Sequence, residues 1–233
     1  MTDNNIRQIT IGFNSKISNA EIPYFRAAVI ATTEKDNQLF HNHDGDGFRY
    51  SYPLIQYKRI HQKASIVCID EGVEAIGKFL GACSFDMMIG NRPATLEIES
   101  VKANKTLVQI WDCMFTYSIR KWLPFNHDNY AKYMSAESIA DKATMLERML
   151  IGNILSFAKG MKIHLDKQIQ CKIISSEEPR LVTYKGIKMM SFDVMFKTNV
   201  SLPNYIGLGK GVSLGFGTVV SDDKNDKTQY IHE

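Results

Sequence analysis

Near its C-terminal end the chain reads GLGKGVSLGFG over residues 207–217, a stretch that holds five of its 15 glycines. Glycine adopts positive φ at no steric cost, so this backbone can turn sharply and expose its N–H groups to a ligand. Lys210, in the middle of the run, favours an anionic ligand, and apolar residues on both sides tether the run to a core. The alternative is an ordinary turn between two strands, because glycine runs are common in turns.

The run does not match the two common phosphate-binding fingerprints. A P-loop needs a first glycine where this chain has Asn204, and a hydroxyl where it has Gly211. A dinucleotide-binding turn needs a third glycine where this chain has Val212. Nucleotide-binding enzymes of these two classes are therefore disfavoured.

Length and composition indicate an ordinary globular protein. The 233 residues are 44% hydrophobic and 23% charged, which allows one large domain or two small ones. We see neither an apolar run of membrane-spanning length nor a charged-then-apolar signal at the N-terminus. The four cysteines lack a C-x-x-C pairing, which is typical of reduced thiols. We therefore expect a cytoplasmic protein without a membrane partner.

The charge of the chain is unevenly distributed. The net charge is +3, yet residues 159–217 hold nine Lys and Arg against four Asp and Glu, a local balance of +5. The remainder therefore carries −2. This concentration of positive charge beside the glycine run predicts a polyanion-binding face, although surface lysines alone also give modest excesses.

The first half of the chain has the pattern β-α-β-β-α-β. Alternating and helical hydrophobic periodicities predict strands over 7–13, 52–57, 64–69 and 94–101, and helices over 21–32 and 71–80. This order is typical of a ferredoxin-like domain, in which two helices cover one face of a sheet.

The second half predicts a degenerate version of the same unit. A polar connector at 102–105 leads to a strand at 106–111, and a long helix follows from about residue 135 or 138 to 159. Gly160 fits a C-terminal cap, and Trp111 and Trp122 are expected in a core. Three further strands are predicted at 168–174, 180–184 and 190–196, and a second helix is not evident. We therefore divide the chain into domains 1–105 and 106–233.

A second segment, FHNHDGDGFRY at residues 40–50, is rich in side chains that can bind a metal ion or act in catalysis. An EF-hand loop that starts at Asn42 has Pro53 where the bidentate glutamate belongs, and the metallo-hydrolase string His-x-His-x-Asp-His does not match. Zinc would need a further ligand from elsewhere in the chain. A metal-free site fits the residues better, so we expect neither a metal nor a cofactor.

The pair His41 and His43 suits RNA cleavage by an internal nucleophile. Two residues apart on an extended backbone, their side chains project to one side with Cα atoms roughly 7 Å apart. An unperturbed imidazole pKa of about 6.5 allows one ring to act as base on a ribose 2′-OH and the other as acid on the leaving oxygen. Arg49, Lys58 and Arg59 lie close in sequence and can stabilise negative charge. The alternative is an exposed loop with incidental histidines.

Together, the glycine run and the histidine segment resemble a known family. Residues 207–219 resemble the C-terminal glycine-rich signature of the CRISPR repeat-processing endoribonucleases of the RAMP superfamily. The string YSYPLIQYK at 50–58 resembles one branch of that family. In that branch a His-x-His pair followed seven positions later by a tyrosine carries the chemistry, which corresponds to His41, His43 and Tyr50.

The resemblance implies an α+β fold of two tandem ferredoxin-like domains, the second degenerate, with a C-terminal glycine-rich loop. It also implies a metal-independent endoribonuclease that cuts CRISPR precursor RNA within its repeats. Attack by a 2′-OH would leave a 5′-hydroxyl and a 2′,3′-cyclic phosphate. We expect His41, His43 and Tyr50 to be catalytic, with either histidine as the base. The expected RNA-binding residues are Arg49, Lys58, Arg59, Gly207, Gly209, Lys210, Gly211 and Gly215.

Two other functions share part of these features. A non-catalytic RAMP subunit that holds guide RNA in a CRISPR effector complex has the glycine run but needs no imidazole pair. A metal hydrolase would use the cluster of histidines and aspartates. The partners that we expect are CRISPR repeat RNA, effector-complex proteins and a second copy of the chain.

Overall fold

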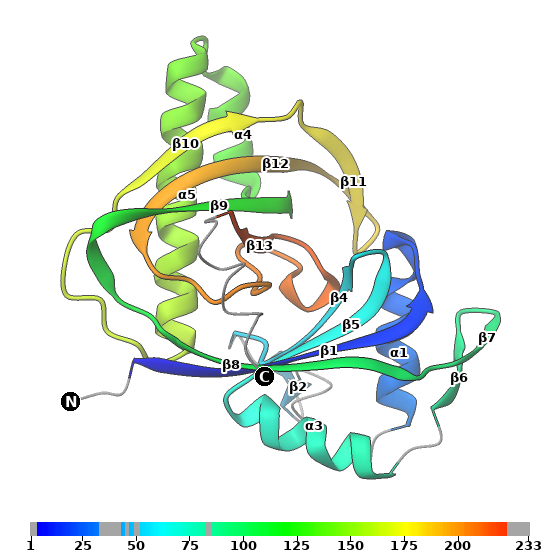
Figure 1. The fold of residues 1–233 in the computed structure, drawn as a ribbon. Coiled ribbons are helices and arrows are strands. Elements are labelled where there is room, and N and C mark those ends of the chain that lie inside the picture. The colour runs from blue at the N-terminus through cyan, green and yellow to red at the C-terminus, as the bar shows by residue number, and fades with distance from the viewer. Residues whose placement is uncertain (1–3, 33–42, 45–46, 49–51, 83–84, 223–233) are drawn as a thin grey trace. The chain divides into compact units, whose positions relative to one another are not determined.

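The computed structural model describes residues 4–32, 43–44, 47–48, 52–82 and 85–222 (Figure 1). Its residues form two compact units. The N-terminal unit comprises Asn5–Thr106 together with Ser213–Gly215. The C-terminal unit comprises the described residues of Met1–Asn4, Leu107–Val212 and Phe216–Glu233.

The N-terminal unit is built on a four-stranded sheet in the order β4-β5-β1-β8. If its four strands are numbered along the chain, this is the order 2-3-1-4 of a ferredoxin-like sheet. Its elements are β1 (Asn5–Lys16), η1 (Asn19–Glu21), α1 (Ile22–Ala31), β2 (His43–Asp44), β3 (Gly47–Phe48), β4 (Ile55–Ile60), β5 (Lys63–Ile69), α3 (Glu71–Ala82), β6 (Asp86–Ile89), β7 (Arg92–Thr95) and β8 (Ile98–Leu107).

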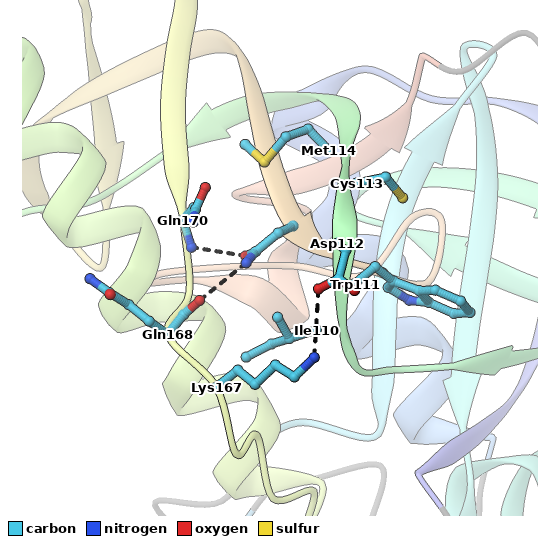
Figure 2. Close-up of a pocket in the computed structure, with 9 residues that line it drawn as sticks. Ile110, Trp111, Asp112, Cys113, Met114, Lys167, Gln168 and Gln170 are labelled. Atoms are coloured by element: carbon cyan, nitrogen blue, oxygen red, sulfur yellow. Dashed lines mark hydrogen bonds and ion pairs between the residues drawn. The ribbon is translucent and has the colours of Figure 1, made fainter.

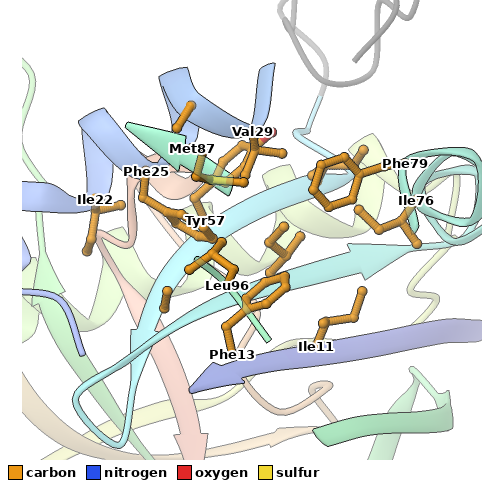
Figure 3. Packing of buried hydrophobic residues seen from close by; sticks show 14 of the residues in the cluster. Ile11, Phe13, Ile22, Phe25, Val29, Tyr57, Ile76, Phe79, Met87 and Leu96 are labelled. Atoms are coloured by element: carbon orange, nitrogen blue, oxygen red, sulfur yellow. The ribbon is translucent and has the colours of Figure 1, made fainter. Parts of the chain in front are cut away.

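One face of this sheet forms the hydrophobic core of the unit with α1 and α3 (Figure 3). Phe25 of α1 contacts the rings of Phe13 and Tyr57 edge-on, with centroids 6.0 and 5.8 Å away. Phe79 of α3 packs in the same cluster. The chain reverses into α1 through a capping box, in which the Ser18 N–H donates to the Glu21 carboxylate at 2.7 Å. Packing against α1 and α3 therefore determines which side chains of β1 and β4 point into the core.

The end of this unit differs from the sequence prediction. The strand expected over 94–101 is divided between β7, which forms a hairpin with β6, and β8. The polar connector expected at 102–105 lies inside β8. Every residue from Ile98 to Lys105 is exposed, so the polar pattern reflects a solvated strand rather than a loop.

The C-terminal unit has a sheet in the order β10-β12-β9-β13, and β11 pairs with β12 beside it. In Figure 1, helices α4 and α5 stand side by side next to this sheet. The elements are β9 (Ile110–Trp122), α4 (His127–Ser135), α5 (Ile139–Gly160), β10 (Cys171–Ser176), β11 (Arg180–Tyr184), β12 (Ile187–Val200), η2 (Val212–Leu214) and β13 (Thr218–Ser221).

Helix α5 begins and packs as its sequence predicts. The Ser138 hydroxyl accepts the Asp141 N–H at 2.9 Å, and Leu150, Ile154 and Phe157 are buried along one stripe. Trp122 at the end of β9 is fully buried and donates its indole N–H to the Asn153 side chain at 2.8 Å. This bond joins the central strand to the helix.

Three sequence predictions for this unit are wrong. The strand expected at 106–111 spans the junction between β8 and β9, because the chain leaves one strand and enters the next there. Helix α4 was not expected, since its nine residues bury no side chain completely. Trp111 remains 38% exposed, and its indole N–H donates to the Ser201 hydroxyl at 2.9 Å instead of packing in the core.

Candidate nucleic-acid interface

The glycine run closes on itself between two paired segments of the C-terminal unit. Gly207 forms a β-bridge with Thr218, and the Leu208 N–H donates to the Gly217 carbonyl at 2.9 Å. The run is therefore a closed loop that leads into β13.

Glycine is required at several places in this loop because its backbone packs tightly. Gly209 and Gly217 have φ values of +86° and +61°, in the left-handed region that favours glycine. A Cβ atom at Gly217 would overlap the Leu208 carbonyl oxygen, and one at Gly209 would lie 2.9 Å from the Trp122 indole nitrogen. Backbone conformation and packing within the unit therefore require glycine at positions 209 and 217.

Several N–H groups of the run are already used inside the unit. The Lys210 N–H donates to the Leu123 carbonyl at 3.3 Å, and the Phe216 N–H donates to the Gly211 carbonyl at 3.3 Å. The Gly217 N–H donates to the Lys121 carbonyl at 3.1 Å. The expectation that the run presents its N–H groups to an anion does not hold for these donors, or for Leu208, because the loop needs them to fold.

Cations and aromatic rings gather around the loop instead. The rings of Tyr184 and Phe216 meet edge-on with centroids 5.6 Å apart, and a Cβ atom at Gly211 would lie within 3.0 Å of both residues. The Lys121 ammonium lies 4.6 Å from the Phe216 ring centroid, and the Lys185 ammonium lies 5.8 Å from that of Tyr184. Lys210, next to Gly211, is exposed. We call Lys121, Tyr184, Lys185, Lys210 and Phe216 the basic-aromatic cluster.

A tight hairpin positions one end of this cluster. Tyr184 pairs with Ile187 across the β11–β12 ladder, so only Lys185 and Gly186 form the turn. Both have positive φ, at 49° and 79°, which is the geometry of a two-residue turn matched to the strand twist. The hairpin thereby holds Lys185 beside the Tyr184 ring.

Most of the predicted catalytic segment lies outside the described residues. This applies to His41, Arg49 and Tyr50. The backbone of His43 is described, and it lies in β2, where His43 pairs with Phe48 of β3. The structure therefore shows an extended backbone at one of the two histidines.

The predicted cations of β4 have contrasting environments. Arg59 is exposed and donates its Nε–H to the Ile17 carbonyl at 2.7 Å. Lys58 is only 1% exposed, and burial lowers its pKa to about 7. Lys58, expected to bind RNA, is therefore not a surface cation: alternation along β4 places it on the face opposite Tyr57 and the hydrophobic core, and that face is covered as well.

Lys58 belongs to a polar set on the sheet face opposite the hydrophobic core. Its cross-strand neighbour is Ser65, which is 2% exposed, and Gln56 is fully buried on the same face. A Cβ atom at Gly215 would lie 3.8 Å from the Lys58 Cα and 3.4 Å from the Tyr57 carbonyl oxygen. Gly215 thus packs closely on β4 within the N-terminal unit, to which Ser213–Gly215 belong.

A separate pocket of about 370 Å³ lies in the C-terminal unit between the start of β9 and residues 167–170 (Figure 2). The buried Asn199 side chain accepts the Gln170 N–H at 2.8 Å and donates to the Gln168 carbonyl at 3.1 Å. Lys167 faces Asp112 at 3.6 Å across the mouth. This carboxylate offsets the positive charge, so the pocket does not favour a polyanion.

Two family models match consecutive parts of the chain. The Cas6b N-terminal domain matches residues 4–107, and the Cas6b C-terminal domain matches residues 109–221. The chain belongs to the Cas6b family. The family resemblance drawn from the two sequence motifs is thereby confirmed as membership of the Cas6b family.

Individual proteins and solved structures are also similar to this chain. An uncharacterized protein of Methanocaldococcus jannaschii is 35% identical over 102 residues, which are 44% of this chain and 68% of that protein. A crystal structure of Cas6b is 27% identical, with a TM-score of 0.85, and the match covers 93% of this chain and 99% of the other. A crystal structure of the CRISPR RNA processing endoribonuclease Cas6b is 24% identical, with a TM-score of 0.73 and the same coverage. The tandem ferredoxin-like fold is therefore confirmed.

The RNA-binding residues predicted from the sequence include Lys210 and none of the other four members of the basic-aromatic cluster. Lys185 and Tyr184 carried a signal, because Lys-Gly between two alternating apolar runs is typical of a hairpin turn. The sequence gives no signal for Lys121 and Phe216, since their contact depends on how β9 and the glycine loop pack. Among the described residues, no three His, Cys, Asp or Glu side chains gather as a metal ion would need. Within those same ranges, no helix has both the length and the apolar character for a membrane crossing.

Proposed function

We propose that this chain is an endoribonuclease that cuts CRISPR precursor RNA within its repeats without a metal ion. The observation that carries the proposal is membership of the Cas6b family along nearly the whole chain. One member of that family is named a CRISPR RNA processing endoribonuclease. Family membership, rather than sequence identity to that single structure, supports the same activity here.

The proposed chemistry uses three residues of the N-terminal segment. One of His41 and His43 takes the proton of a ribose 2′-OH, and the oxygen attacks the adjacent phosphorus. The other histidine gives a proton to the departing 5′-oxygen as the P–O bond breaks. The products are a 2′,3′-cyclic phosphate and a 5′-hydroxyl. Tyr50 orients the phosphate or stabilises its charge, and the backbone of His43 itself is extended.

RNA binding is proposed at the basic-aromatic cluster. Its three lysines place positive charge around the half-buried Tyr184 ring and the buried Phe216 ring, so the lysines suit phosphates and Tyr184 suits an unpaired base. Arg49 and Arg59 are the proposed contacts in the N-terminal unit. Gly207, Gly209, Gly211 and Gly215 act in the proposal by shaping the loop that carries Lys210. Lys58 is left out as a direct contact because it is buried.

Single-turnover cleavage of repeat RNA by histidine variants tests this proposal. His41→Ala and His43→Ala should each slow cleavage by about 10²–10⁴-fold while RNA affinity changes little. His164→Ala, at an exposed histidine of the C-terminal unit, is the matched control and should cleave at the wild-type rate. Wild-type rates for both variants would refute the assigned roles.

The same experiment distinguishes the proposed endoribonuclease from the alternative function, a non-catalytic subunit. A non-catalytic guide-RNA-binding subunit would bind the repeat but leave it intact in the wild-type protein. The proposal includes two partners besides the repeat RNA, namely proteins of a CRISPR effector complex and a second copy of this chain.

A further inference from the structure

The turn between β4 and β5 holds two side chains in a backbone conformation that favours glycine. Ile60 pairs with Lys63, so His61 and Gln62 alone form the turn. Both have positive φ, at 48° and 68°, which is the geometry of a type I′ turn. Asn-Gly is a strongly preferred pair there, because a Cβ atom is disfavoured in the left-handed region. The sequence therefore keeps His and Gln where they strain the backbone.

Two other hairpins of the chain reduce this strain with a glycine. Gly90 supplies the positive φ of the turn between β6 and β7, and Gly186 occupies one of the two left-handed positions between β11 and β12. The turn between β4 and β5 has no glycine. Residues in such conformations persist where the surrounding structure holds them, and they cluster at functional sites.

Main-chain contacts explain the conformation of this turn but not its side chains. The Gln62 carbonyl accepts the Ile17 N–H at 3.1 Å, and the Ile17 carbonyl accepts the Arg59 Nε–H at 2.7 Å. A glycine at position 62 would accept the first bond equally well. The side chains of His61 and Gln62 are exposed, and within the described ranges neither makes a hydrogen bond or an ion pair. The fold therefore does not need these two side chains.

The surroundings of the turn are positively charged. Arg59 lies two residues before His61, and Lys16 is the cross-strand neighbour of Lys63, which follows the turn. Both cations are exposed, and neither has an ion pair with a carboxylate of the described residues. Lys63 itself is neutralised by Glu99. We call Lys16, Arg59, His61 and Gln62 the turn cluster.

We infer that the turn cluster binds a phosphodiester of the RNA backbone. The inference rests on the proposed function, which supplies the RNA, and it adds His61 and Gln62 to the contacts of the N-terminal unit. Arg59 and Lys16 provide positive charge, and the imidazole and the amide provide N–H donors. A phosphate suits this set because each of the four side chains can donate a hydrogen bond and none carries negative charge.

Two double variants separate the side chains from the backbone strain. The pair His61→Asn and Gln62→Gly relieves the strain, so it should shift the urea midpoint upwards by about 0.5 M. It should also raise the dissociation constant for repeat RNA by about tenfold at fixed salt, because two donors are lost. The pair His61→Ala and Gln62→Ala removes the same donors but keeps a Cβ atom at both positions. It should lose as much affinity without the gain in midpoint.

Gly77→Ala is the matched control for stability. Gly77 is exposed in α3, and a Cβ atom there would meet no other atom within 4 Å, so alanine should stabilise the same unit through helix propensity. Its RNA affinity should equal that of the wild type. Wild-type affinity in both double variants overturns the inference, and so does a loss confined to the Asn-Gly pair. An unchanged midpoint for the Asn-Gly pair overturns the premise of strain.

A second RNA tests the chemical class of the ligand. A phosphate contact carries no sequence information, so both double variants should lose the same factor on repeat RNA and on a scrambled RNA of equal composition. A loss confined to the repeat overturns the phosphate assignment. Cleavage by the wild type is scored separately. A wild type that cuts the repeat while both variants keep full affinity refutes this inference alone, and one that binds but does not cut refutes the proposed function alone. A wild type that binds no RNA refutes both.

Discussion

Replacing Gly217 by alanine tests whether the glycine loop is specified by packing. Gly217 has a φ of +61°, and a Cβ atom there would overlap the Leu208 carbonyl oxygen. The left-handed conformation alone costs an alanine about 1–2 kcal/mol. Relief of the overlap also breaks the hydrogen bonds from Leu208 to Gly217 and from Gly217 to Lys121, each contributing about 1 kcal/mol. We expect Gly217→Ala to lower the free energy of unfolding by about 3–4 kcal/mol.

Gly186→Ala provides the matched control in the same unit. Gly186 has a φ of +79°, but a Cβ atom there would meet no other atom within 4 Å. This variant should therefore lose only the conformational cost of about 1–2 kcal/mol. Urea unfolding followed by tryptophan fluorescence measures both, since Trp122 is buried next to the loop. Equal losses in the two variants would refute the packing argument for the glycine run.

Two further predictions concern the lysines. Burial lowers the pKa of Lys58 to about 7, whereas an unfolded lysine titrates at about 10.4, so between these values only the unfolded state holds the extra proton. The free energy of unfolding of the wild type, relative to that of Lys58→Met, should therefore rise with pH in this window by up to about 1.4 kcal/mol per pH unit. Urea titrations of both proteins measure this difference, and a difference that stays constant with pH contradicts a lowered pKa at Lys58. Joint replacement of Lys121, Lys185 and Lys210 by alanine should reduce the slope of log affinity for single-stranded repeat RNA against log salt by about 2. Lys132→Ala should leave that slope unchanged, and an unaltered slope in the triple variant would exclude the cluster from phosphate binding.

Local patterns predicted much of the fold. The alternation in β1 and the periodicities of α1, α3 and α5 follow from burial of one face, whereas β5 is a short apolar run that is buried on both faces. β8 could not be predicted in this way, because it is exposed on both faces and lacks an alternating pattern. α4 was missed for a similar reason, since it buries no residue completely.

Less of the candidate site than of the fold could be predicted from the sequence. Lys210 was predicted because it lies inside a recognisable motif, whereas Lys121 approaches Phe216 only through the pairing of distant segments. The burial of Lys58 was not predicted, because the sequence does not reveal that this face of β4 is covered. The family assignment succeeded because two short motifs, far apart in the chain, matched the same family independently.

Cleavage of repeat RNA in excess EDTA tests the central claim most directly. The substrate is compared with an otherwise identical RNA in which a single deoxynucleotide removes the 2′-OH upstream of the cut. We predict that the unmodified RNA is cut at an undiminished rate to a 2′,3′-cyclic phosphate and a 5′-hydroxyl, and that the deoxy-substituted RNA remains intact. Loss of cleavage on chelation, or cutting of the deoxy-substituted RNA at the same bond, would contradict the account.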